Sequence, residues 1–250
     1  RFEMTRGLGV AGTSGGVVMA DYLFEPPAVF AVPVHGEPAL YPVRRVFCVG
    51  RNYASHAAEM GAEVDRAAPF YFTKSVASLA HSGVTAAYPP GTSDFHFEME
   101  LVVALGAAVF RSTAQQAQAA VFGYACGLDM TRRDLQAIAK EKRQPWDIGK
   151  DVEQSAVVST ITPAAVVGEI GPQRIALSVN GVTRQDARLS DMIHSVPAIV
   201  RHLSGYYHLG PGDLIFTGTP AGVGAVGPGD VLEGTIDGLS PVRATIGVPD

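Results

Sequence analysis

The sequence FHFEMELVVAL, at residues 95–105, alternates its side chains in the manner of a β-strand. Successive side chains of a strand point to opposite faces, so Glu98 and Glu100 share one face with His96 and Val102. The apolar continuation after Glu100 favours a central strand, and the other interpretation is a solvated edge strand with its charges outward. Two carboxylates on a buried face repel each other and require a cation. The stretch therefore predicts a sheet-based core that holds an acidic site.

A third carboxylate follows the next apolar run. Asp129 lies between residues 121–128, which we expect to form a strand, and residues 130–142, which we expect to form a helix. Alone, Asp129 is more typical of an ordinary helix N-cap. Arg133 and Gln136 follow it on the expected helix, at spacings that allow both side chains to face its carboxylate. Because three carboxylates form an all-oxygen ligand set, the pattern favours Mg²⁺, Mn²⁺ or Ca²⁺ over zinc.

Turn residues divide the rest of the chain into short segments. The chain has 28 glycines and 17 prolines among 250 residues, which is typical of strands joined by tight turns. Asn180-Gly181 predicts a type I′ hairpin, and Gly-Pro-Gly-Asp, at 210–213 and again at 227–230, fits type II turns. Helices are expected at residues 115–120 and 190–203. The pattern predicts an α+β fold with one main core.

Three segments are expected along the chain. Residues 1–18 are rich in Gly, Ser and Thr and are interpreted as an upstream extension, with Met19 as the native start. Residues 19–42 are punctuated by prolines and are expected to form a small N-terminal segment. Residues 43–250 are expected to form the catalytic domain, because the acidic residues, the predicted hairpin and both Gly-Pro-Gly-Asp segments lie within them.

Composition excludes several kinds of partner. The net charge is −5, with 19 Lys and Arg against 24 Asp and Glu, which argues against a nucleic-acid surface. No uncharged apolar stretch reaches the roughly 18 residues that a membrane span needs. The only cysteines, Cys48 and Cys126, lie in apolar runs and are interpreted as reduced, buried thiols of a cytoplasmic protein.

The segment Gly50–Glu59 contains a candidate base. His56 and Glu59 are three residues apart, so in a helical turn Glu59 can orient the imidazole. A base held by an orienting carboxylate is the pairing that activates water. The other interpretation is a surface ion pair. Residues 52–68 as a whole are expected to form a short helix or a mobile flap.

Several motifs occur together in an order and spacing that resemble the fumarylacetoacetate hydrolase family. The resemblance covers residues 43–250, and residues 46–53 most resemble the fumarylpyruvate hydrolases and related acylpyruvases within that family. Each motif alone is weak, whereas the ordered set is specific. The matching motifs are Gly50–Glu59, Phe72–Lys74, Glu98–Leu101, Gly127–Gln136, Trp146 with Lys150, Asn180-Gly181, Pro211–Asp213 and Phe216–Gly224.

The resemblance implies a mixed β-sandwich roll with a few peripheral helices, and a homodimer. It implies one Mg²⁺ or Mn²⁺ ion bound by Glu98, Glu100 and Asp129. It implies that His56 and Glu59 activate water, and it gives Lys150 a catalytic role as well as a role in binding. The residues that would hold the carboxylate and keto oxygens of the substrate are Arg133, Gln136, Lys150 and Thr219.

The implied reaction is metal-dependent hydrolysis of a carbon–carbon bond in a 2,4-dioxo acid. The preferred substrate is an acylpyruvate, fumarylpyruvate, which would yield fumarate and pyruvate in aromatic catabolism. The alternative is decarboxylation or isomerisation of a 2-oxo acid such as oxaloacetate, with the same metal and enolate chemistry.

A fumaryl group ends in a second carboxylate, which needs a cation at some distance from the metal. Arg51 and Lys74 are the candidates. The other interpretation makes Arg51 a hydrogen-bonding residue of its turn and Lys74 a solvated strand end.

Two positions depart from the family's pattern. Ser75 stands where the family has a proline, and Asp151 begins Asp-Val-Glu where Ser-Phe-Asp is common. A negative charge beside Lys150 would weaken the attraction of that lysine for an anionic substrate, unless the carboxylate of Asp151 faces away.

Overall fold

The computed structural model describes residues 7–13, 16–59 and 66–249. It divides into two compact units, residues 1–30 and residues 31–250. In the first unit, strands β1 (Gly7–Thr13) and β2 (Gly16–Tyr22) pair as an antiparallel hairpin. This hairpin includes residues on both sides of the expected junction between positions 18 and 19.

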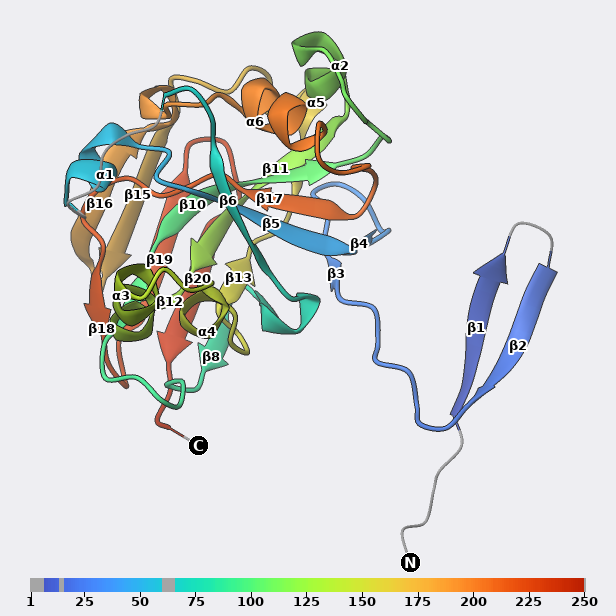
Figure 1. Ribbon diagram of the computed structural model, residues 1–250, viewed down its shortest axis with the longest axis horizontal. Helices are drawn as coiled ribbons and strands as arrows, with labels where there is room; N and C mark the ends of the chain where they lie inside the picture. The colour runs from blue at the N-terminus through green and yellow to red at the C-terminus, as the bar shows by residue number, and fades with distance from the viewer. Residues whose placement is uncertain (1–6, 14–15, 60–65, 250) are drawn as a thin grey trace, which may run out of the picture. The chain divides into compact units, whose positions relative to one another are not determined.

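The second unit is built on a large mixed sheet, whose strand order is β6-β5-β17-β10-β11-β13-β7, with β14 also paired to β11 (Figure 1). Strand β10 lies between β11 and β17 and pairs antiparallel with both, so the prediction of a central strand is confirmed. The strands of this sheet are β5 (Arg45–Gly50), β6 (Phe70–Lys74), β7 (Leu79–His81), β10 (Met99–Leu105), β11 (Val121–Asp129), β13 (Ala156–Val158), β14 (Thr162–Pro163) and β17 (Asp213–Phe216).

A second sheet packs against the large one and has the order β16-β15-β19-β20-β8. Strand β15 contacts β10, and β19 contacts β11, so the apolar faces of the two sheets share one core. Burial of these faces is the main favourable term in forming such a sandwich. The predicted mixed β-sandwich roll is thereby confirmed. The strands of the second sheet are β8 (Val84–Ala86), β15 (Arg174–Val179), β16 (Val182–Arg188), β19 (Val231–Ile236) and β20 (Val242–Ile246).

The stretch at residues 95–105 forms two strands rather than one. It is interrupted at Glu98, between β9 (Phe95–Phe97) and β10. Strand β9 belongs to a separate small sheet with β12 (Thr131–Arg132) and β18 (Gly224–Val226). The alternation survives the interruption, because the aromatic and aliphatic side chains of both strands lie in the same core. A further short pair is formed by β3 (Ala31–Val32) and β4 (Tyr41–Pro42).

Helices α2, α5 and α6 gather at one end of this unit, and α3 and α4 lie at the other (Figure 1). None of the described helices is long and apolar enough to span a bilayer. The helices are α1 (Ala54–Glu59), α2 (Ala114–Ala119), α3 (Arg133–Glu141), α4 (Asp147–Lys150), α5 (Ala164–Val167) and α6 (Val196–Leu203), with short 3₁₀ helices at Val76–Ser78 and Leu189–Asp191.

Two helices begin later than the sequence predicts. The helix expected from residue 130 begins at Arg133, because β12 first pairs with β9, so Asp129 ends a strand and caps no helix. The helix expected from residue 190 begins at Val196. There the backbone N–H groups of residues 193 and 194 donate to the carbonyl and side-chain oxygens of Asn52, which removes them from a helical turn.

The predicted turns are present. Asn180 and Gly181 have φ angles of 51° and 78°, as a type I′ turn requires. Gly212 and Gly229 have φ angles of 91° and 94°, and each turn is closed by a 3.1 Å backbone hydrogen bond from the Asp that follows. Cys48 and Cys126 are buried and free, as predicted.

Gly127 gives a test of the packing at the centre of the large sheet. A Cβ atom there would lie 2.5 Å from Val102 Cγ2 and 2.7 Å from Phe216 Cε1, and both of those side chains are fully buried. Gly127→Ala should therefore lower the free energy of unfolding by about 1–3 kcal/mol, measured by urea denaturation. Gly171→Ala is the matched control, because no described residue other than Gly171 and its two chain neighbours has an atom within 4 Å of the added Cβ. Equal stability of the two variants would contradict the close packing of Gly127 against Val102 and Phe216.

Candidate active site

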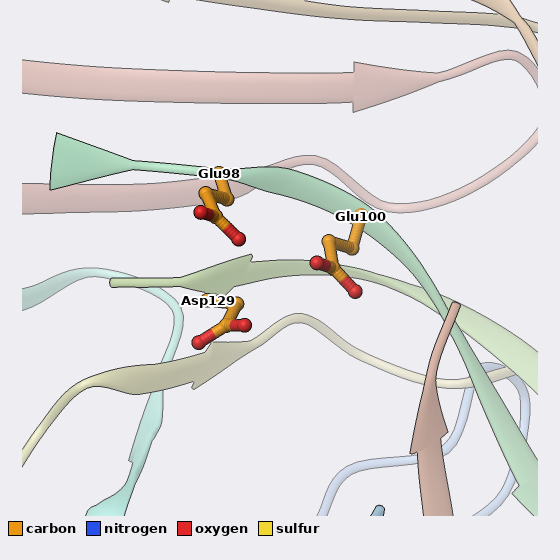
Figure 2. Close-up of side chains that lie close together, drawn as sticks. All are labelled: Glu98, Glu100 and Asp129. Carbon is orange, nitrogen blue, oxygen red and sulfur yellow. The ribbon is translucent and has the colours of Figure 1, made fainter. Parts of the chain in front are cut away.

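Three carboxylates converge at the ends of neighbouring strands. Glu98 lies at the break between β9 and β10, Glu100 is the second residue of β10, and Asp129 ends β11. In the antiparallel register, Glu100 lies opposite Gly127, two residues before Asp129. The three carboxylates point toward one another (Figure 2). One oxygen from each lies within 4.8 Å of the others, and all three residues are buried. The structure thus brings together the three residues proposed as metal ligands.

Basic side chains compensate the negative charge of Glu98. The guanidinium of Arg133 donates to Glu98 Oε1, and the ammonium of Lys150 donates to Glu98 Oε2 at 2.8 Å. Burial alone would raise the pKa of Glu98, but the charges of Lys150, Arg133 and His56 outweigh it and hold that pKa well below its usual range. Glu98 is therefore ionised in the folded protein.

Two lysines flank Asp129. Lys150 Nζ lies 2.7 Å from Asp129 Oδ2 and joins it to Glu98. Lys74 Nζ lies 3.0 Å from Asp129 Oδ1, without hydrogen-bond geometry, so Oδ1 has no hydrogen-bond partner among the described residues. Lys74 donates instead to Met130 O at 3.0 Å and Ser155 Oγ at 2.7 Å. Because Lys74 is only 3% exposed, the interpretation of it as a solvated strand end is wrong.

Glu100 is the carboxylate without a cation. No Lys, Arg or His of the described chain lies within ion-pair distance of it, and it accepts a 2.7 Å hydrogen bond from the backbone N–H of Gly218. Burial, followed by the charges of Asp129 and Glu98, raises the pKa of Glu100 well above its usual range. Together with Asp129 Oδ1, which accepts no hydrogen bond from the described residues, this carboxylate gives the cluster the oxygen donors and the uncompensated charge that suit a divalent cation.

The backbone conformation at position 218 requires a glycine. Its φ angle is +96°, a conformation that residues with a Cβ rarely adopt, and a Cβ there would lie 2.8 Å from Asn52 Cβ. Asn52 also donates from Nδ2 to Thr217 O at 2.8 Å. These contacts hold the loop after β17 against Glu100.

A cavity opens beside the carboxylates. Most of the predicted site residues line it: Arg51, His56, Glu98, Glu100, Arg133, Gln136, Lys150 and Thr219. Phe72, Lys140 and Trp146 also line it, whereas Asp129, Lys74 and Glu59 do not.

The predicted base and its orienting carboxylate are adjacent on α1. His56 Nδ1 lies 3.3 Å from Glu59 Oε2, and His56 is 7% exposed and faces the cavity. Glu59 also accepts from the backbone N–H of Gly222 at 3.1 Å, which ties α1 to the loop before β18. A His ring held in this way leaves its other nitrogen for a water molecule. Of the expected flap at residues 52–68, positions 60–65 lie outside the described residues.

Helix α3 presents one face to the cavity. Arg133 donates from Nη1 to Gln136 Oε1 at 2.7 Å, so the two side chains act as one unit. Lys140, which sequence reasoning missed, lines the cavity from the same helix. Lys140 lies four residues after Gln136, which itself lies three residues after Arg133. This is the spacing of one helix face, so periodicity along α3 was the signal that could have found Lys140.

Gln185 was also missed. It is fully buried in β16, donates from Nε2 to Thr219 Oγ1 and to Pro220 O, both at 2.8 Å, and accepts from Met99 N at 3.0 Å. It therefore positions Thr219 at the cavity wall. Its neighbours along β16 are largely exposed, so only strand alternation could have indicated a buried role.

The two departures from the family pattern contact each other. Asp151 Oδ1 accepts from the backbone N–H of Ser75 at 3.0 Å and from its hydroxyl at 2.9 Å. A proline at position 75 would have no N–H to donate. The carboxylate of Asp151 is thus held by Ser75, and it links the residue after Lys74 to the residue after Lys150.

Comparison with known sequences gives a consistent result. Residues 45–247 match the family model described as "Fumarylacetoacetate (FAA) hydrolase C-terminal". The chain is 52% identical over 191 residues to a fumarylpyruvate hydrolase of Ralstonia sp., covering 75% of this chain and 98% of that protein. It is 39% identical over 201 residues to an oxaloacetate tautomerase of Escherichia coli K12, covering 80% and 91%.

Comparison with solved structures extends this likeness to the fold. The crystal structure of a fumarylpyruvate hydrolase from Pseudomonas aeruginosa, in complex with Mn²⁺ and pyruvate, has a TM-score of 0.88 and 44% sequence identity, covering 91% of this chain and 99% of that one. The predicted resemblance is confirmed by sequence and by structure: this chain belongs to the fumarylacetoacetate hydrolase family.

Proposed function

We propose that this chain is a divalent-metal-dependent hydrolase that cleaves the carbon–carbon bond of an acylpyruvate. The observation that carries the proposal is the buried carboxylate cluster, with Glu100 uncompensated, beside a cavity that also contains His56. The relatives support it, because the Ralstonia protein is a fumarylpyruvate hydrolase and the Pseudomonas enzyme binds Mn²⁺ and pyruvate. Fumarylpyruvate is the preferred substrate.

Glu98, Glu100 and Asp129 would hold one Mg²⁺ or Mn²⁺ ion. Carboxylate oxygens suit both ions, and Asp129 Oδ1 accepts no hydrogen bond from the described residues that a metal would have to displace. When bound, the ion supplies a Lewis acid for the keto oxygen of the substrate.

The basic residues around the cluster retain donors for an anionic substrate. An ammonium has three donors, and Lys150 uses two of them on Glu98 and Asp129. Burial lowers the pKa of Lys150, but the charges of Asp129 and Glu98 outweigh it and raise the pKa, so the ammonium stays protonated. Arg133 and Lys150 would bind the carboxylate and 2-oxo end of the substrate, with Gln136 and Thr219 beside them.

Hydrolysis then follows from the position of His56. It accepts a proton from a water molecule, whose oxygen attacks the 4-oxo carbon, while Glu59 keeps the ring oriented. The bond between carbons 3 and 4 breaks, and its electron pair leaves on the pyruvate fragment as an enolate. Lys150 and Arg133 stabilise this negative charge as it develops. Proton return to the enolate carbon gives pyruvate, and the acyl carbon leaves as a carboxylic acid.

Tautomerisation of oxaloacetate is the second candidate function, because the E. coli relative is an oxaloacetate tautomerase. Decarboxylation requires no activated water, so the His56–Glu59 pair favours hydrolysis over that alternative. Homodimer formation and a place in aromatic catabolism remain predictions from the resemblance, and a cytoplasmic location remains a prediction from the two cysteines.

The reaction itself can be tested directly. Protein loaded with Mn²⁺ or Mg²⁺ should release equal amounts of fumarate and pyruvate from fumarylpyruvate, measured by chromatography, and EDTA should abolish the release. Rapid interconversion of oxaloacetate tautomers, with no hydrolysis of fumarylpyruvate or acetylpyruvate, would establish the second function instead.

Two isosteric substitutions at the cluster should change stability in opposite directions. Glu100 has a raised pKa, so its stabilising protonated form is present at low pH and is lost as pH rises through that pKa. Glu100→Gln in EDTA at pH 8 should therefore melt roughly 3 °C or more above wild type. Glu98 has a lowered pKa, and Glu98→Gln removes the carboxylate that pairs with buried Arg133 and one of the two that pair with Lys150, so it should melt lower.

Calorimetry with and without Mn²⁺ completes this test. Both variants should lose the rise in Tm that the metal gives wild type, because each removes a proposed ligand. A full metal-dependent rise in both variants would show that the ion binds elsewhere.

The base is tested by His56→Ala. Hydrolysis should fall by roughly 10²–10⁴-fold, the usual range for loss of a general base. Mn²⁺ affinity, measured by titration calorimetry, should stay near the wild-type value, because His56 is not one of the three proposed ligands. Glu59→Gln should cause a smaller loss. Wild-type hydrolysis by His56→Ala would remove His56 from the mechanism.

A further inference from the structure

Two cations at the cavity have no carboxylate partner in the described part of the chain. Lys140, on α3, and Arg51, directly after β5, both line it. No ion pair among the described residues includes either side chain, whereas Arg133, Lys150 and Lys74 all pair with carboxylates of the cluster. The cavity therefore has an acidic end, where cations are compensated, and a second region where they are not.

These two cations line the same cavity, so their like charges act on each other. Burial, followed by the charges of Arg51 and Arg133, lowers the pKa of Lys140. Arg51 is itself held in place, with its guanidinium 6.0 Å from the ring centroids of both Phe70 and Trp146. Its φ angle of 59° is one that few residues other than glycine adopt. Like charges arranged in this way are stabilised by an anion between them.

The distance between the two regions suits a short dicarboxylate. Lys140 lies seven residues beyond Arg133 on α3, or about 10 Å along the helix axis. Arg133 contacts Glu98 at the acidic end. An extended chain of seven carbons spans roughly 7–8 Å, and a hydrogen bond at one end adds about 3 Å. Together these lengths match the separation of about 10 Å between Arg133 and Lys140 along the helix.

We infer that Lys140, together with Arg51, binds the second carboxylate of a dianionic substrate whose first carboxylate lies at the acidic cluster. The inference rests on the proposed function for the identity of that substrate. It makes Lys140 a specificity-determining residue, in the role for which the sequence suggested Lys74. The geometry favours Lys140 because Lys74 is buried against Asp129 and does not line the cavity.

The kinetic test compares two substrates that differ in this carboxylate. In Lys140→Met, kcat/KM for fumarylpyruvate should fall about 10- to 150-fold, the cost of one charge-assisted contact. For acetylpyruvate, which lacks the second carboxylate, it should change less than about twofold. Lys142→Met is the matched control, because Lys142 is exposed at the end of the same helix and does not line the cavity. Equal losses for both substrates, or none, would overturn the inference.

A binding measurement separates this inference from the proposed reaction. Calorimetric titration of the Mn²⁺-loaded protein should show tighter binding of fumarate than of crotonate, in which a methyl group replaces one carboxylate. Lys140→Met should remove that difference, and Lys140→Arg should keep most of it. If wild type hydrolyses neither substrate but this preference is present and depends on Lys140, the inference stands and the proposed reaction fails. An unchanged preference in Lys140→Met overturns the inference.

Discussion

Three buried carboxylates, each with one oxygen within 4.8 Å of the other two, are the main electrostatic constraint on this fold. Repulsion and lost hydration would exclude such a cluster from a protein interior unless cations surround it. Three basic side chains from three different segments do so: Lys74 from β6, Arg133 from α3 and Lys150 from α4. The helices at this end of the sandwich are therefore coupled to the sheet through charge as well as through apolar contact.

The negative charges of the three carboxylates are compensated unevenly. Glu98 and Asp129 each contact at least one cation, while Glu100 accepts a hydrogen bond from Gly218 and retains a raised pKa. Complete compensation would remove the tendency of the cluster to bind a further ion. As it is, the protein pairs two of the carboxylates with cations and leaves the third, Glu100, without one among the described residues.

Neutral polar residues keep the elements around the cluster in register. Asn52 holds the loop after β17 and the segment before α6, and Gln185 links β16 to β10 and to the loop that carries Thr219. Both side chains are fully buried with their hydrogen bonds made inside the protein. Buried polar groups of this kind are costly when unpaired, so they specify one arrangement of the segments they join.

Local patterns in the sequence were sufficient for much of this fold and for the acidic cluster. Alternation in residues 95–105 placed Glu98 and Glu100 together, and Asn180-Gly181 and both Gly-Pro-Gly-Asp segments form the expected turns. These features depend on neighbouring residues, whose φ preferences and side-chain directions are set within a few positions. The pairing of His56 with Glu59 is local for the same reason.

Contacts between distant segments determined the remainder. Pairing of β9 with β12 and β18 broke the strand at Glu98 and delayed α3 to Arg133, and the hydrogen bonds of Asn52 delayed α6. Lys74 is buried against Asp129, which is 55 positions away in the sequence. Lys140 approaches Arg51, which is 89 positions away. No local periodicity records such a contact, because its free energy depends on which segments the folded sheets bring together.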